Sequence, residues 1–394
     1  MIVRPRRGCA RRALLVLAGI CAGAMAAAPT FAQITQNSLT LNGTTFALTP
    51  IELDRLTALG RYVHTSNRGA QDSALEAARS VANSNDSRYV LALYQLEIGR
   101  QRQDDTLRAQ ALDVLLASRQ TPQDRLPSYL AVRGNIAFRA GDLATASTLW
   151  TRQMALQPDD PQLLNNLAQV RAAQNDAQGA VDLLRRAIAA HRGGPPPEIW
   201  YRQWLAIAGN GRLVDQGTAA GLALVAAYPT PANWRDSLVI YRQLAAPQGR
   251  AEIDLLQLMR TAGALARPAE YQRLAQLLLH AGSAAEGKAV LDEGVARGIV
   301  NRSEPPTPAI RAEIDRAIAA PSSRTGPALS FLNGSDAASG SAPFAAAVAA
   351  VRAGRRAEAE QAFRALAGQG EGQAGGRWHR DLSSFWLAWL AHPA

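Results

Sequence analysis

The chain has 394 residues, of which 47% are hydrophobic and 19% are charged, and its formal net charge is +10. Its two cysteines, Cys9 and Cys21, lie near the start, so the rest of the chain holds no disulfide, thiolate metal site or cysteine nucleophile. Five of the positive charges are arginines of the first 12 residues, which leaves +5 for the remainder. There the arginines alternate with acids, as in 311–316, so we expect no nucleic-acid partner.

The first 32 residues have the layout of a secretory signal peptide. The early arginines are followed by an uncharged apolar run from Ala13 to Ala28 and by small residues at Thr30 and Ala32. This run is shorter than the roughly 20 residues that a membrane-spanning helix needs. We therefore expect cleavage after Ala32 and export to the periplasm, with membrane contact unlikely beyond the signal peptide.

Two features leave the route of export open. Arg11-Arg12 is the kind of pair found in twin-arginine signals, which carry folded proteins, but an arginine-rich segment produces such pairs by chance. Cys21 is a candidate lipid acceptor, although Ile20 stands where a lipoprotein signal needs a small residue.

Residues 33–60 form an N-terminal segment with a possible β-hairpin. Leu39 to Leu48 alternates apolar and polar residues around Asn42-Gly43, the dipeptide that favours tight hairpin turns. Residues 61–126 follow as a helical region, since Arg88–Arg100 and Leu107–Ala117 carry apolar residues at helical spacing.

Residues 127–194 contain an internal repeat with an offset of 34 residues. Large residues align with large ones and small with small, and Gly141 aligns with Asn175, both of which tolerate a left-handed turn. The other aligned pairs are Pro127 with Pro161, Leu130 with Leu164, Gly134 with Ala168, Asp142 with Asp176, Ala146 with Ala180, and Trp150 with Leu184.

This pattern resembles the tetratricopeptide repeat, a helix–turn–helix unit of 34 residues, in an exported bacterial-type protein. The resemblance rests on Gly134, the Gly141-Asp142 turn, Ala146, Trp150 and Pro158, and it departs from the family at Arg133, Gln153 and Arg192. It implies an all-α fold, an α-solenoid of antiparallel helix pairs in which each pair packs on its neighbours.

The core of the repeat recurs later in the chain. A turn residue is followed five positions on by a small residue, and four further on by a large one, which places both on one helix face. The four instances are Gly141-Ala146-Trp150, Asn175-Ala180-Leu184, Gly282-Gly287-Leu291 and Gly354-Ala359-Phe363.

The remaining regions follow from composition and spacing. Residues 195–300 read as divergent helical pairs, and 301–344 as a linker rich in Pro, Ser and Gly with one helical piece at Ile310–Ala320. Residues 345–394 form a helical pair and cap. The amphipathic helix Trp378–Ala391 either caps the last repeat or contacts a membrane surface through Trp386 and Trp389.

No segment points to catalysis, a cofactor or a metal. Gly282 to Lys288 has the glycine and lysine spacing of a phosphate-binding loop, but Ala289 stands where Ser or Thr must bind the metal. The preceding Tyr271–His280 has helical spacing, whereas that motif follows a strand. None of the histidines has a metal-ligand spacing, so we expect no catalytic residue, cofactor or metal site.

The resemblance implies that the first helix of each repeat lines a concave surface that takes a peptide or partner protein. The residues it assigns to this surface are Asn135, Phe138, Arg139, Asn165, Asn166 and Gln169. Amides and an arginine suit the backbone and carboxylates of an extended peptide. The alternative is that these polar residues only form the scaffold and face water.

We therefore expect a non-enzymatic interaction scaffold in the cell envelope. The alternative is an accessory to polysaccharide or cell-wall processing, with a glycan-binding or catalytic site in 195–300 where Trp200, Trp204 and Trp234 stack on sugars. A third possibility is a partner of the outer surface or of a secretion apparatus.

Overall fold

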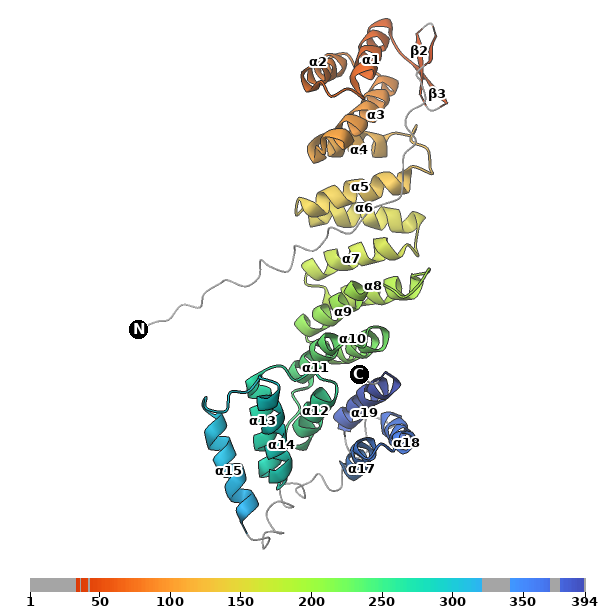
Figure 1. The fold of residues 1–394 in the computed structure, drawn as a ribbon. Coiled ribbons are helices and arrows are strands. Elements are labelled where there is room, and N and C mark those ends of the chain that lie inside the picture. The colour runs from red at the N-terminus through yellow and green to blue at the C-terminus, as the bar shows by residue number, and fades with distance from the viewer. Residues whose placement is uncertain (1–32, 36, 42, 321–340, 369–375, 393–394) are drawn as a thin grey trace, which may run out of the picture. The chain divides into compact units, whose positions relative to one another are not determined.

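The computed structural model describes residues 33–35, 37–41, 43–320, 341–368 and 376–392 (Figure 1). The predicted signal peptide lies outside these residues. The chain divides into two compact units at Pro158–Asp159, and each is described by itself.

Unit 1 begins with a small antiparallel sheet in the order β1-β2-β3. Its strands are β1 (Gln33–Thr35), β2 (Ser38–Leu41) and β3 (Thr44–Ala47). The predicted hairpin is β2 and β3, paired with Thr40 opposite Thr45, and Gly43 in its turn has φ +80°. The sheet packs on the helices through Phe46, whose ring stacks on Tyr89 at 5.5 Å, so it is part of the hydrophobic core.

Six helices follow in unit 1, and neighbours in sequence pack as pairs. They are α1 (Pro50–Tyr62), α2 (Arg68–Arg79), α3 (Asn85–Arg102), α4 (Asp105–Ala117), α5 (Leu126–Arg139) and α6 (Leu143–Leu156). Helix α1 begins within 33–60, where we predicted only a hairpin. Its start is set by a capping box between Thr49 and Glu52, with Pro50 in the first turn.

Glu52 also fastens α1 to α3. Its side chain is only 3% exposed. One carboxylate oxygen accepts hydrogen bonds from the backbone N–H of Thr49 at 2.9 Å, and the other from that of Ser84 at 3.0 Å, just before α3. Burial alone would raise the pKa of Glu52, but these hydrogen bonds outweigh it and lower the pKa to about 2.

Replacing Glu52 should therefore destabilise unit 1 in a pH-dependent way. Because the folded pKa is depressed, the stabilisation is present above pH 4.5 and is lost as the pH falls towards 2. Glu52→Gln should lower the free energy of unfolding at neutral pH by about 2–3 kcal/mol, measured by urea denaturation. The exposed Glu76→Gln is the control, and equal effects of the two variants would contradict the assignment.

Unit 2 continues the series of helix pairs. Its helices are α7 (Pro161–Ala173), α8 (Ala177–Ala190), α9 (Glu198–Asn210), α10 (Val214–Ala227), α11 (Pro231–Ala245), α12 (Arg250–Thr261), α13 (Pro268–His280), α14 (Ala284–Ala296), α15 (Thr307–Ala319), α17 (Ser341–Arg352), α18 (Arg356–Ala367) and α19 (Gly376–Ala391). The all-α solenoid of antiparallel pairs is confirmed. Helix α17 begins inside the predicted linker 301–344, which also contains α15, and residues 321–340 lie outside the described residues.

The predicted turn motif is confirmed in all four places. Gly141 and Asn175 have φ of +80° and +63°, and Gly282 and Gly354 are likewise left-handed. The small and large residues that follow are buried on the inner side of α6, α8, α14 and α18. Two further turns use residues that gave no signal in the sequence, Gln103 (φ +56°) and Arg212 (φ +54°).

Gly134 shows why a small residue is needed in the first helix of a pair. A Cβ added there would lie 2.2 Å from Nε1 of Trp150, which is 1% exposed on α6. The missing side chain therefore lets α5 approach α6 closely enough for the indole to lie between them.

Gly134→Ala should consequently lower the free energy of unfolding by about 1–3 kcal/mol through overpacking, despite the better helix propensity of Ala. Gly69→Ala in α2 is the matched control, because the nearest atom to its added Cβ is 3.7 Å away, and it should be neutral or stabilising. Thermal unfolding of both variants checks this, and a stabilised Gly134→Ala protein would refute the packing argument.

The C-terminal helix does more than cap the last repeat. Helix α19 packs on α17 and α18 and also on α10 and α12, so it joins elements far apart in the sequence (Figure 1). Its Phe385 fills the space over Gly221, where an added Cβ would be 3.2 Å from the ring. Gly221 follows the Arg212 turn by nine positions, where earlier repeats carry Trp150 or Leu184.

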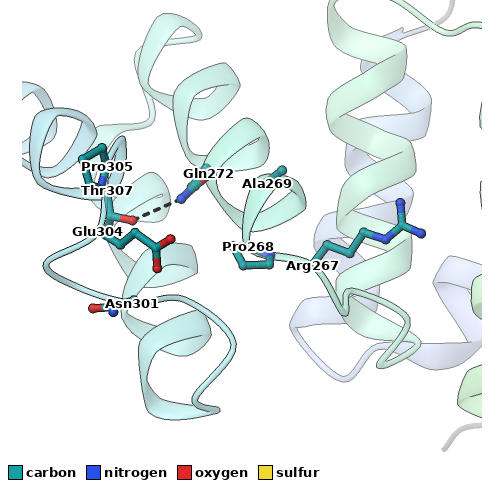
Figure 2. Close-up of a pocket in the computed structure, with 8 residues that line it drawn as sticks. All are labelled: Arg267, Pro268, Ala269, Gln272, Asn301, Glu304, Pro305 and Thr307. Atoms are coloured by element: carbon teal, nitrogen blue, oxygen red, sulfur yellow. Dashed lines mark hydrogen bonds between the residues drawn. The ribbon is translucent and has the colours of Figure 1, made fainter.

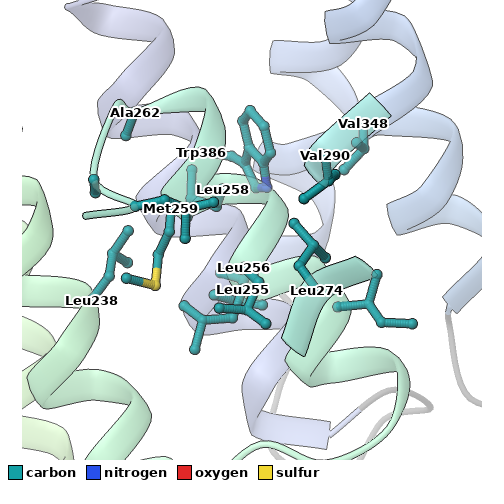
Figure 3. Close-up of a cluster of buried hydrophobic side chains, with 14 of the residues drawn as sticks. Leu238, Leu255, Leu256, Leu258, Met259, Ala262, Leu274, Val290, Val348 and Trp386 are labelled. Carbon is teal, nitrogen blue, oxygen red and sulfur yellow. The ribbon is translucent and has the colours of Figure 1, made fainter. Parts of the chain in front are cut away.

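One continuous hydrophobic cluster results, in which side chains of α11–α14, α17 and α19 meet (Figure 3). Within it Trp386 is 1% exposed and stacks on Phe363 at 5.6 Å. Membrane contact through Trp386 is therefore wrong, because the indole lies in the core. Helix α12 is buried on every side from Ala251 to Met259, as expected for a helix enclosed by its neighbours.

Candidate functional site

Three of the predicted contact residues lie on α5 in unit 1. Arg139 is exposed, and its guanidinium pairs with Asp105 of α4 at 2.5 Å. Phe138 is half-buried, with its ring 5.6 Å from that of Trp150, so it contributes mainly to packing. Asn135 is also half-buried. At this surface α5 offers one charged side chain, already engaged, and one amide.

The other three lie on α7 in unit 2. Asn165 is 3% exposed and belongs to the core. Asn166 is half-buried and accepts a hydrogen bond from Gln162 at 3.0 Å, while Gln169 is half-buried. Helix α7 therefore presents the amide of Asn166, whereas Nε2 of Gln169 is buried. The six residues thus fall into two sets, three on α5 in unit 1 and three on α7 in unit 2.

The tryptophans considered for glycan stacking are buried. The exposed fractions of Trp200, Trp204 and Trp234 are 5%, 7% and 1%. Trp200 meets His191 edge-on at 5.5 Å, and the guanidinium of Arg185 lies 5.9 Å from the ring of Trp204. Indoles held in this way present no open face to a sugar ring.

Polar side chains connect the first helices of successive pairs in unit 2. Arg202 of α9 donates to Asp236 of α11 at 2.9 Å, and Gln272 of α13 donates to Thr307 of α15 at 3.1 Å. Each bond spans 34 or 35 residues, so the repeat register persists through the divergent region. These bonds hold the polar side chains of this face in fixed positions.

The best-buried of these links joins α11 and α13. Arg235 binds both carboxylate oxygens of Glu270 at 2.8 and 2.9 Å, with 19% of the arginine and 9% of the glutamate side chain exposed. Burial would raise the pKa of Glu270, but the guanidinium and the backbone N–H of Ala266 hold it below its usual value.

Removing the guanidinium should leave a buried carboxylate without its counter-charge. We expect Arg235→Gln to lower the free energy of unfolding at pH 7 by about 3 kcal/mol, measured by chemical denaturation. Arg202→Gln breaks a far more exposed pair, so it should cost less than about 1 kcal/mol. Equal losses in the two variants would contradict this difference.

A polar pocket of about 380 Å³ lies beside this face, between the starts of α13 and α15. Figure 2 shows the Gln272–Thr307 hydrogen bond at one side of it, with the Glu304 carboxylate between Asn301 and Pro268. Arg267 and Glu304 are exposed, and neither makes an ion pair with another residue of the described chain. The pocket thus offers an anion and an amide to an incoming group, while the side chain of Arg267 extends away from Glu304 and Gln272 (Figure 2).

A second polar cleft lies where α12, α14 and α17 meet. Arg352 of α17 pairs with Glu286 of α14 at 2.7 Å, and Gln257 of α12 donates to the same carboxylate at 2.9 Å. Deeper in, Asp254 is 4% exposed and pairs with Arg250 at 3.1 Å. Two adjoining hollows, of about 100 and 450 Å³, share Gln257, Glu286 and Arg352.

Sequence reasoning missed Asp254, although one signal was available. It is an acid within the run Ile253–Met259, whose other residues are apolar apart from Gln257. Arg352, Arg267 and Glu304 gave no comparable signal, because isolated charges at helix ends and in loops are typical of any surface.

Two other kinds of site, a metal centre and a membrane span, do not occur among the described residues. No cluster of three or more His, Cys, Asp or Glu side chains suited to a metal ion occurs among them. None of the helices described combines the length and apolar character that crossing a membrane requires.

Comparison with known proteins adds little to this description. No protein-family model matches the chain, and no curated protein matches it. Among solved structures it is similar to BtubC (BKLC) from P. vanneervenii, at 15% sequence identity and a TM-score of 0.28, over 71% of this chain and 97% of that one. A TM-score this low supports no inference. The all-α fold is established by the helices described above.

Proposed function

We propose that this chain is a non-enzymatic binding scaffold of the tetratricopeptide type, which holds a protein or peptide partner along the first helices of unit 2. These are α7, α9, α11, α13 and α15. The signal-like residues 1–32 support a place in the periplasm or an equivalent envelope compartment.

The observation that carries the proposal is the difference between the two sides of the helix pairs. On the second-helix side, α10 and α12 are covered by α19 of the same chain. On the first-helix side, Arg202, Asp236 and Gln272 lie at least partly exposed, each held by a hydrogen bond to a neighbouring first helix. The first-helix side is therefore the one at which a partner meets fixed polar groups.

This arrangement suits an extended segment of another protein. The amide of Asn166 can both donate to and accept from a peptide backbone, and the guanidinium and carboxylate groups can bind charged side chains. Because neighbouring helices already fix several of these side chains, binding loses less side-chain entropy than at a mobile surface. The exposed Ile199, at 47%, adds apolar contact beside Arg202.

Site-specific photo-crosslinking in the native host tests the proposal. A photoreactive residue at Ile199 or Gln272 should give a discrete crosslinked protein, whereas one at the exposed Gln361 of α18 should give none. The charge reversal Arg202→Glu should reduce the yield at Ile199 at least several-fold. Equal adducts from all three positions, or none from the first helices, would refute this assignment.

A further inference from the structure

Asp254 is a carboxylate placed inside the contact between α12 and the C-terminal helices. The hollow around it is lined on the α17 side by Ala345, Val348 and Ala349 and on the other side by Ile253 and Leu278. Only 4% of the Asp254 side chain is exposed. Docking of α17 therefore encloses an ionisable group between these apolar side chains and the polar ones of Gln257, Glu286 and Arg352.

The charged groups that face Asp254 come from three helices. Arg250 on α12 itself pairs with it at 3.1 Å. From α14 comes Glu286, and from α17 comes Arg352, but these two pair with one another at 2.7 Å. Helix α13 contributes Leu278 and no charge to the hollow. Arg250 is thus the one ion-pair partner of Asp254 in the described chain, and it stays partly in water.

We propose that docking of α17–α19 on α12 is a pH-sensitive contact, which is tighter when Asp254 is protonated and weaker when it is ionised. Undocking α17 opens the hollow to water, which favours the carboxylate. The docked arrangement favours the neutral acid, since burial outweighs the compensation from Arg250, which stays partly in water, and from Arg352, which is paired with Glu286. Helices α17 to α19 are also held in place by the Arg352–Glu286 pair, by the pair of Arg377 with Asp215 of α10, and by the apolar side of α19.

The direction of the effect follows from proton uptake. Burial raises the pKa of Asp254 to about 6 in the docked state, and exposure returns it to an ordinary value near 4. The docked state therefore holds the extra proton between these values, so docking weakens as the pH rises through them. From about pH 5 to about pH 7.5 the docking equilibrium should fall by about tenfold.

Hydrogen exchange of the whole chain, read on peptides from α17 and α19, tests the proposal. After normalisation to the intrinsic exchange rates at each pH, protection should fall by about tenfold between about pH 5 and about pH 7.5. In Asp254→Asn the side chain is neutral at both pH values, so protection should stay high and constant. Asp292→Asn, in a partly exposed pair with Arg311, should retain the pH dependence of the parent chain.

A second variant keeps the test decisive if Asp254→Asn does not fold. Arg250→Gln removes the ion-pair partner and should move the loss of protection to higher pH, because the carboxylate then loses its compensation. Equal protection of the parent protein at both pH values would overturn the proposal. So would a full pH response in Asp254→Asn, or an unshifted response in Arg250→Gln.

Discussion

The close approach of two helices at a small residue is the constraint on which the rest of this structure depends. Gly134 leaves room for the ring of Trp150, and Gly287 lies so close to α13 that an added Cβ would be 2.9 Å from the carbonyl oxygen of Ala275. Each pair buries an apolar face in this way but leaves another open, so it needs a neighbouring pair. The series of helices follows from that need.

The C-terminal helices obey the same rule by a different route. At Gly221 the chain omits the large residue that fills earlier pairs, and Phe385 fills the space from α19. Tyr241 meets the same ring edge-on at 5.7 Å. The gap in one repeat is thus closed by a residue from the far end of the chain. This closure covers the second-helix side and leaves polar groups on the other side.

Much of the fold could be predicted from the sequence because the turns carry local signals. Gly141 and Asn175 favour a left-handed backbone, and a small residue five positions later marks the face that packs. Gln103 and Arg212 adopt the same backbone without any such preference. Both are exposed, and their turns are closed by backbone hydrogen bonds from Asp104 to Gly99 and from Leu213 to Ala208. The turn at Arg212 therefore left no signal of the repeat register in the sequence, although hydrogen bonds such as Arg202–Asp236 preserve that register.

The candidate site was less predictable for a physical reason. A repeat pattern indicates which helix comes first in a pair but not how deeply each side chain is buried. The pattern therefore predicted Asn165 at the surface, although it lies in the core. The environment of Asp254 depends on α17, nearly one hundred residues later in the chain. No local pattern encodes a contact of that range.

The position of Phe385 has a consequence for how the protein reaches its native state. Solenoids are built mostly from contacts between sequence neighbours, which form quickly because little chain entropy is lost. The contact of Phe385 with α10 joins residues 221 and 385, so it is strongly non-local. Unit 2 can order most of its pairs as they emerge, but its hydrophobic interior is sealed only after the last helix has been made. Until then Trp234 and Tyr241 lack their contact with Phe385. The nascent chain therefore exposes hydrophobic surface of the kind that chaperones recognise.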